Sequence, residues 1–368
     1  MKGADKMNKP IGLYIHIPFC RHKCPYCDFY SVTASALIDE YINAVIRNIS
    51  NISDYYTFDS VYFGGGTPSL LTPLQVRNIV SKINVTDYAE ISMECNPESS
   101  DSNKLSAFRK AGINRISFGV QSLSDTELKH LGRIHNAETA ERAIYSAYDA
   151  GFDNISADLM LGICSQTLSS AKETVNILTS FPLTHISAYM LKIEKGTPYY
   201  NDTVILQDIP DEDTTCDIYL NTISMLKEKS FVQYEISNFS KPGYECRHNL
   251  KYWLCEDYYG VGPGAHSCIN NKRFYVEKDI HKFISSQTQE TVISDENACG
   301  FFEQAMLRLR LKDGISMLDY PEHSERILNN AQPLIRAGLV KHKGNNILIT
   351  EKGYLVSNEI ICRLLDED

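Results

Sequence analysis

Three cysteines, Cys20, Cys24 and Cys27, follow one another in the spacing Cys-x3-Cys-x2-Cys. They come directly after a short apolar segment, residues 13–17, which Pro18 ends, and this pattern predicts a loop that leaves a buried strand. Thiols this close in the chain can bind one metal centre. A structural zinc site or an electron-transfer iron–sulfur cluster takes four protein ligands, whereas three thiolates on a four-iron cluster leave one iron open for another ligand.

Two other interpretations fit the same cysteines. Cys24-Pro25-Tyr26-Cys27 is by itself a dithiol redox motif of the glutaredoxin type. A zinc ion is the other interpretation, with its fourth ligand drawn from elsewhere in the chain. The cysteines alone leave the open cluster, the dithiol and the zinc site as alternatives.

Strand and helix patterns alternate along the first two thirds of the chain. Strands are expected at residues 13–17, 60–63, 91–94, 115–118, 154–159 and 185–191, and helices at residues 37–50, from 72, and at 104–111, 140–150, 168–178 and 213–229. Thr72-x-x-Gln75 with Pro73 has the form of a helix capping box. The strands read as near-continuous apolar runs, which predicts a parallel sheet with helices outside. We expect a partial (β/α)6 barrel of the TIM type over residues 1–235, with a doubly wound sheet as the alternative.

Polar residues and glycines at the ends of these strands favour the barrel. Cys20 follows the first strand, Gly65 lies in a Gly-Gly-Gly-Thr-Pro loop after the second, and Glu94 ends the third. Gln121 lies just past the fourth strand and Asp158 near the end of the fifth. Because the carboxyl ends of barrel strands form the active face, we expect these residues to surround one site.

The pattern changes after residue 231. We expect residues 236–296 to form a connecting segment that carries the HNLKYW motif at residues 248–253. Residues 297–368 are expected to form a small, mostly helical, winged-helix-like domain. A hairpin is expected within it at residues 343–350, because Gly344-Asn345-Asn346 offers turn chemistry.

The composition restricts the function classes. The formal net charge of -10 argues against nucleic acid as a partner, because proteins that bind it carry basic surfaces. The 11 cysteines are odd in number and scattered, unlike a disulfide framework. Seven of those outside the loop are expected to be buried, namely Cys95, Cys164, Cys216, Cys255, Cys268, Cys299 and Cys362. Free thiols predict a reducing compartment, and in the absence of an apolar leader the chain is expected in the cytoplasm.

Together the motifs resemble those of the radical S-adenosylmethionine (SAM) superfamily and, within it, the HemW-type haem chaperones. The residues that carry the resemblance are YIHIPFC, CPYCDFYS, GGGTPS, ECNPE, GVQS, DLMLG, YEISNFSKPGYECRHNLKYW and GVGPGAHS. These chaperones are relatives of oxygen-independent coproporphyrinogen III dehydrogenase. The resemblance implies a radical SAM partial barrel, with a 4Fe–4S cluster, SAM and haem as cofactors. It also implies that the chain delivers haem to recipient haem proteins.

The resemblance implies the site residues as well. Cys20, Cys24 and Cys27 would hold the cluster, whose open iron binds SAM before electron transfer breaks a carbon–sulfur bond and releases a deoxyadenosyl radical. The residues implied at the first SAM site are Tyr14, Gly65 and Glu94. Those that match positions around a second SAM in the dehydrogenase are Tyr26, Gly66, Thr67, Gln121, Arg133 and Asp158. Judged as single residues, Gln121 and Arg133 could instead bridge loops of the barrel, and Asp158 could bond neighbouring backbone amides.

His248 is the candidate ligand of the haem iron, because imidazole is the commonest haem-iron ligand. Tyr252 and Trp253, beside it, could pack on a porphyrin face. A lone histidine can also be a structural hydrogen-bonding residue. His16 and His266 are the other candidates.

Two departures from the dehydrogenase bear on the function. Phe29 stands where the dehydrogenase has a fourth cysteine, and only 19 residues precede Cys20, where the dehydrogenase has a longer segment. They favour the chaperone, which is not expected to be an enzyme, over a decarboxylating dehydrogenase, while Cys20 and the glycine loop disfavour a dithiol oxidoreductase. Membrane-associated respiratory proteins are candidate recipients, and a homodimer is compatible with this interpretation.

Overall fold

Strands β1 to β6 lie side by side and parallel, in chain order, in the computed structural model, which describes residues 9–366. They form the centre of a 12-stranded sheet with the order β12-β11-β10-β9-β1-β2-β3-β4-β5-β6-β8-β7, which does not close on itself. The strands are β1 Ile11–Ile17, β2 Phe58–Gly65, β3 Val85–Cys95, β4 Arg115–Gln121, β5 Ile155–Leu161, β6 His185–Met190, β7 Val232–Gln233, β8 Asn238–Ser240, β9 Tyr258–Val261, β10 His266–Ile269, β11 Lys272–Val276 and β12 Thr291–Asp295.

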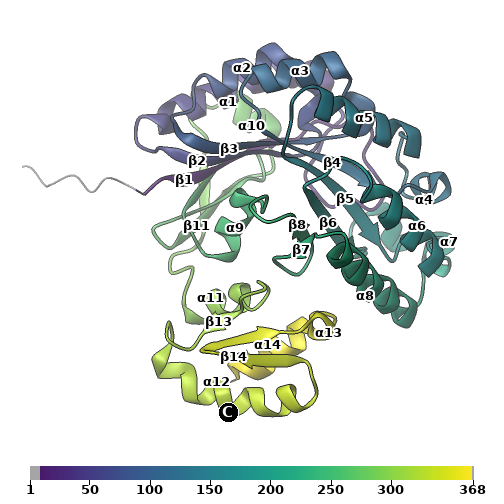
Figure 1. Cartoon of the computed structure of the whole chain (residues 1–368). Coiled ribbons are helices and arrows are strands. Elements are labelled where there is room, and N and C mark those ends of the chain that lie inside the picture. The colour runs from purple at the N-terminus through teal and green to yellow at the C-terminus, as the bar shows by residue number, and fades with distance from the viewer. Residues whose placement is uncertain (1–8, 367–368) are drawn as a thin grey trace, which may run out of the picture.

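A helix follows each of the six parallel strands and covers the convex face of the sheet (Figure 1). These helices are α1 Ile38–Ser53, α2 Pro73–Val80, α3 Ser102–Lys110, α5 Ala137–Asp149, α6 Leu168–Leu178 and α8 Glu212–Glu228. The expected partial barrel of strand–helix units is confirmed. The capping box of α2 is present, because Thr72 Oγ1 accepts from Gln75 N–H (3.2 Å) and the Gln75 side chain accepts from Thr72 N–H (2.8 Å). Two short helices, α4 Asp125–His130 and α7 Thr203–Gln207, lie in the loops after β4 and β6.

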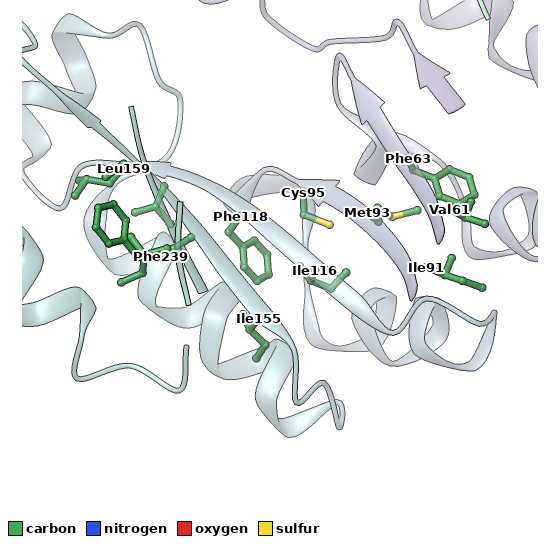
Figure 2. Close-up of a cluster of buried hydrophobic side chains, with 14 of the residues drawn as sticks. Val61, Phe63, Ile91, Met93, Cys95, Ile116, Phe118, Ile155, Leu159 and Phe239 are labelled. Carbon is green, nitrogen blue, oxygen red and sulfur yellow. The ribbon is translucent and has the colours of Figure 1, made fainter. Parts of the chain in front are cut away.

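Side chains on β2 to β6 alternate between an apolar outer face and a polar inner face. The outer residues form one buried cluster, which Figure 2 shows with side chains such as Phe63, Met93 and Phe118. Burying each large apolar side chain contributes about 1.5–3 kcal/mol. The inner face carries Tyr62, Glu94, Arg115, Ser117, Asp158, His185 and Ser187. The expectation of near-continuous apolar strands is wrong for this inner face, because the barrel interior holds a polar cavity.

The chain beyond β6 extends the sheet at both edges. Strands β7 and β8 pair antiparallel at the β6 edge, whereas β9 pairs parallel with β1 and leads on to β10, β11 and β12. Helix α9 (Arg247–Trp253) lies on the concave side of the sheet, opposite the outer helices, and α10 (Ile280–Ser285) packs against α1 (Figure 1). The segment 236–296, expected as a connection, therefore contributes strands to the main sheet.

The C-terminal unit combines four helices with a small sheet of strand order β13-β15-β14. Its elements are α11 Phe301–Arg308, β13 Ile315–Ser316, α12 Pro321–Arg336, β14 Val340–Lys343, β15 Asn346–Ile349, α13 Glu351–Tyr354 and α14 Ser357–Leu365. The mostly helical region is confirmed, and its hairpin turns at Gly344, whose φ is +60°. Over residues 9–366, every helix is too short or too polar to cross a bilayer.

All 11 cysteines are free thiols. Cys95, Cys164, Cys268 and Cys299 are buried as expected, while Cys216 and Cys255 are partly exposed. The expectation of burial is wrong for Cys362, which lies on the exposed side of the amphipathic helix α14.

Candidate functional site

The cysteine loop leaves β1 and is held against the loop that follows β2. Gly66 N–H donates to Ile17 O and Thr67 N–H donates to Phe19 O, both at 2.8 Å. The Thr67 hydroxyl donates to Cys20 Sγ at 3.5 Å. The glycine loop therefore shapes the cysteine loop directly, through main-chain bonds that do not depend on a ligand.

The three thiols of this loop are free and partly exposed, so they are available as ligands. A four-iron cluster binds each thiolate through a different iron, so three thiolates leave the fourth iron open. The three thiols therefore fit a four-iron cluster with one open position.

Arg133 is the cation beside the cysteine loop. Its Nη1 lies 3.6 Å from Cys24 Sγ, and its Nη2 donates to Asn96 Oδ1 and to Gly119 O, each at 2.9 Å. It therefore ties together the segments that end β3 and β4 and places a positive charge beside Cys24.

The glycines of the Gly-Gly-Gly-Thr-Pro loop are required by the packing of the protein itself. A Cβ on Gly65 would lie 2.4 Å from the His16 ring, and the Gly65 φ of +108° strains any other residue. A Cβ on Gly66 would lie 2.8 Å from the carbonyl oxygens of Ile17 and Phe19. The loop can approach β1 this closely only without side chains.

A cavity of about 550 Å³ opens inside the barrel beside the cysteine loop. It is lined by Tyr26, Cys27, Asp28, Phe29, Tyr62, Gly65, Gly66, Thr67, Glu94, Cys95, Asn96, Arg115, Ser117, Gly119, Gln121, Arg133, Asp158, Met160, His185, Ser187, Tyr189, Glu194, Cys246 and Asn249. Cys24 lies in a smaller adjoining pocket that shares Thr67 and Arg133 with the cavity. The structure thus brings together the residues expected around SAM, with the exception of Tyr14, while His248 also lies outside the lining.

Glu94 ends β3 and lines the cavity. The Tyr62 hydroxyl donates to Glu94 Oε1 at 2.9 Å, and Gly65 N–H donates to Oε2 at 3.1 Å. Burial, and after it the charge of Asp158, raises the pKa of Glu94 to about 7. A ligand ammonium beside this carboxylate would favour its anionic form, so the position suits a cationic group.

Asp158 and Arg115 supply opposite charges deeper in the cavity. The Ser117 hydroxyl donates to Asp158 Oδ1 at 3.2 Å, and burial raises the pKa of Asp158. Arg115 is 2% exposed and donates from Nη1 to Asn154 Oδ1 at 2.7 Å, but its buried Nε–H has no partner among the described residues. Leaving a buried donor unpaired costs about 1–3 kcal/mol, so a ligand that accepts from Arg115 would recover that energy.

Of three further residues expected at the SAM sites, two line the cavity and the third lies behind its wall. Gln121 lines the cavity with a left-handed φ of 70° at the end of β4, a conformation uncommon outside glycine. Tyr26 lines it too and packs against Tyr199, with ring centroids 6.1 Å apart. Tyr14 lies behind the lining, where its hydroxyl bonds His16 Nδ1 at 3.1 Å and its ring stacks on Tyr62.

His248, the candidate haem ligand, is fully buried on the first turn of α9. Its Nδ1 bonds the Ser60 hydroxyl at 3.0 Å, its Nε2 bonds the Tyr252 hydroxyl at 2.8 Å, and its ring stacks on Tyr62. Burial lowers the pKa of His248 to about 3, so the imidazole stays neutral. Both nitrogens are engaged within the protein in this conformation, and an axial role would require α9 to move. His266, by contrast, is exposed.

Replacing His248 by alanine is expected to lower the free energy of unfolding by about 2–4 kcal/mol, because it leaves two buried hydroxyls unpaired and opens a cavity. Chemical denaturation of the two proteins measures the difference. The matched control is His266→Ala, for which a change within about 0.5 kcal/mol is expected, because the side chain is exposed. Equal effects of the two substitutions would contradict a structural role for His248.

The lining also contains residues that the sequence analysis did not select. Four of them lie on the inner face of the sheet, namely Arg115, Ser117, His185 and Ser187. The alternating patterns Arg-x-Ser and His-x-Ser in the sequence indicate that each pair points to the same face of its strand. Asn249 reaches the cavity from α9, which is distant in the chain, so no local pattern could place it there.

Comparisons with known proteins agree with this arrangement. Residues 14–178 match the model of the Radical SAM superfamily, and residues 301–356 match that of the HemN C-terminal domain. The chain is 33% identical to the heme chaperone HemW of Bacillus subtilis (strain 168), over 96% of this chain and 99% of the relative. The chain belongs to the HemW family. HemW of Escherichia coli (strain K12) is 32% identical, over 97% of this chain and 99% of its own length.

A solved structure shares the fold. The coproporphyrinogen III oxidase HemN from Escherichia coli, described as a radical SAM enzyme, superposes with a TM-score of 0.82 at 21% identity, covering 96% of this chain and 90% of HemN. The likeness confirms the radical SAM partial barrel with its C-terminal region. Membership of this superfamily implies a 4Fe–4S cluster and SAM, in agreement with the three free thiols of the cysteine loop.

Proposed function

We propose that this chain binds haem and delivers it to recipient haem proteins, and that Cys20, Cys24 and Cys27 hold a 4Fe–4S cluster that binds SAM. The observation that carries the proposal is the 33% identity, over 96% of the chain, with a protein named heme chaperone HemW. Respiratory haem proteins at the membrane are the class of recipient proposed, with the chaperone acting in the cytoplasm.

Within this proposal, SAM occupies the inner cavity. A bound cluster supplies an electron and an open coordination position, and the chain supplies the surroundings. Glu94 accepts a hydrogen bond from the ligand, and Gly65 and Gly66 keep the loop beside it free of side chains. Gln121 and Asp158, with Tyr26, Thr67 and Arg133, line the remainder and correspond to the proposed second SAM position.

The mouth of the cavity supplies a surface that suits a porphyrin. Phe29 lines the cavity beside Cys27 and is 68% exposed, and Tyr189 on β6 lines it and is 41% exposed. Two exposed aromatic rings on one cavity can pack on the face of a flat apolar ligand. We place the porphyrin face at this rim, where Phe29 stands in place of the cysteine found in the dehydrogenase, and His248 or the exposed His266 is the proposed axial ligand.

The experiment that tests the function compares haem transfer with enzymatic turnover. Haem-loaded protein, with its cluster assembled without oxygen, is expected to transfer haem to an apo respiratory haem protein, followed by the recipient's absorption spectrum. The same preparation given SAM, a reductant and coproporphyrinogen III is expected to form no protoporphyrinogen IX. Formation of that product would favour the second candidate, the radical SAM dehydrogenase, and failure to accept haem would contradict the chaperone.

Two substitutions at one position test the rim. Phe29→Asp is expected to weaken haem binding about tenfold or more, because burying an aromatic side chain contributes about 1.5–3 kcal/mol. Phe29→Leu keeps an apolar side chain and is expected to retain most of the affinity. Haem titration followed at the Soret band measures both. Equal affinity of the two variants would remove Phe29 from the haem surface.

A further inference from the structure

A second group of metal-binding side chains lies outside the cysteine loop and outside the cavity lining. His130 ends α4, Cys164 lies in the loop after β5, and Asp208 follows α7. Their donor atoms all lie within 4.8 Å of one another, and Cys164 Sγ is 3.2 Å from Asp208 Oδ2. These residues come from three separate loops at the carboxyl-end face of the barrel, so the fold, and not the sequence spacing, brings them together.

The group is held in place by a shared hydroxyl. Ser165 Oγ bonds His130 Nδ1 at 3.0 Å and donates to Asp208 Oδ2, while Ser165 N–H donates to Asp208 O at 2.9 Å. Ser165 has a left-handed φ of 63°, which a non-glycine residue adopts only where its surroundings impose it. The backbone at this corner is therefore fixed in a conformation that aims the neighbouring Cys164 thiol at Asp208.

We propose that His130, Cys164 and Asp208 bind a zinc-type divalent cation, with a water molecule as the fourth ligand. Mixed nitrogen, sulfur and oxygen donors suit Zn²⁺, and three protein ligands plus water are typical of an open zinc site. The thiolate donor excludes Mg²⁺ and Ca²⁺, which take oxygen ligands.

The geometry needs little change to accept the ion. Donors of a tetrahedral zinc site lie roughly 3.3–3.8 Å apart, given bond lengths of about 2.0–2.3 Å. The Cys164–Asp208 contact is already close to that range. His130 is partly exposed and Asp208 is exposed, so their side chains can shift slightly to bring the donor atoms into it. On binding, the Cys164 thiol releases its proton to solvent and its sulfur forms the bond to zinc. No oxidant or reductant is involved.

Zinc binding at this site would stabilise the adjacent side of the cysteine loop through Tyr199. Tyr199 is 2% exposed, donates its hydroxyl to His130 O and donates its N–H to Pro25 O at 3.1 Å. Pro25 adjoins Cys24, so Tyr199 connects the backbone at the zinc site with the backbone of the cysteine loop.

The test uses the full chain with its iron–sulfur cluster already assembled, so that Cys20, Cys24 and Cys27 are occupied. Calorimetric titration with Zn²⁺ is expected to show one site, and zinc-edge X-ray absorption is expected to show one sulfur with nitrogen and oxygen ligands. Asp208→Asn and Cys164→Ser are each expected to weaken zinc binding at least tenfold. Because Asp208 is exposed, its variant is expected to fold even if Cys164→Ser does not.

The control is Cys362→Ser, which removes an exposed thiol from α14 and is expected to leave zinc affinity unchanged. Zinc with three sulfur ligands would mean binding at the cysteine loop and would overturn the proposal. Unchanged affinity in Asp208→Asn, or no saturable binding to the parent protein, would overturn it as well. These outcomes do not depend on haem binding, so the proposed function and the zinc site can fail separately.

Discussion

Replacing Cys24 by alanine is expected to abolish the iron–sulfur cluster and to leave the barrel folded. With only two thiolates, a four-iron cluster loses one of its protein ligands and a second iron becomes unprotected. The barrel should persist, because main-chain bonds from Gly66 and Thr67 hold the loop without a contribution from the thiol. Iron and acid-labile sulfide content, after anaerobic reconstitution, measure the loss, and circular dichroism measures the fold.

Cys20→Ala and Cys27→Ala are expected to behave as Cys24→Ala does. The control, Cys299→Ala, removes a thiol that is buried near Cys268 and remote from the loop, and is expected to retain full iron content. A normal cluster in any of the three loop variants would contradict the ligand assignment. A protein that takes up one zinc in place of iron, with no effect of SAM on its spectra, would contradict the cluster itself.

Glu94→Gln is expected to raise the dissociation constant for SAM about tenfold or more, without loss of iron. A hydrogen bond to a charged group contributes about 1.5–3 kcal/mol, and each 1.4 kcal/mol corresponds to about tenfold in affinity. Calorimetry with the reconstituted protein gives the constant. Glu235→Gln is the matched control, since burial also raises the pKa of Glu235 to about 7 but Glu235 lies outside the cavity lining.

The same carboxylate predicts a pH dependence. Because the pKa of Glu94 is raised to about 7, its anionic, cation-binding form is present above pH 7 and is lost as the pH falls through that value. SAM affinity is therefore expected to fall between pH 8 and pH 6 in the parent protein and to change much less in Glu94→Gln. Parallel pH profiles for the two proteins would place the titrating group elsewhere.

The part of the fold that sequence could predict is the part governed by local rules. Strand–helix alternation and the Thr72 cap act within a few residues, and each appears where expected. The site residues at strand ends could be placed on one face because parallel strands present their carboxyl ends together. These rules are sufficient to group Glu94, Gln121 and Asp158 around one site, and all three line the cavity.

What escaped prediction depends on contacts between distant residues. The pairing of β9 with β1 joins residues near 260 to residues near 13, and no local pattern encodes it. The sequence shows that residue 248 is a histidine, but it does not show that its ring nitrogens bond the hydroxyls of Ser60 and Tyr252. Ser60 lies far from His248 in the chain. Arg115 on β4 and His185 on β6 lie on the inner face because side chains alternate along each strand. Each has apolar neighbours in the sequence, so these segments have the composition of fully buried strands.

The position of β1 inside the sheet has a consequence for biosynthesis. Gly12 pairs with Tyr258 on β9, so the strand that carries the cysteine loop lacks one of its two neighbours until most of the chain has left the ribosome. At translation rates of about 5–20 residues per second, this interval lasts on the order of ten seconds or more. During this interval β1 can pair only with β2, and the thiols of the loop that follows it are exposed to oxidation and to other metal ions. We therefore expect the cysteine loop to be ready to bind a cluster only after β9 has been synthesised.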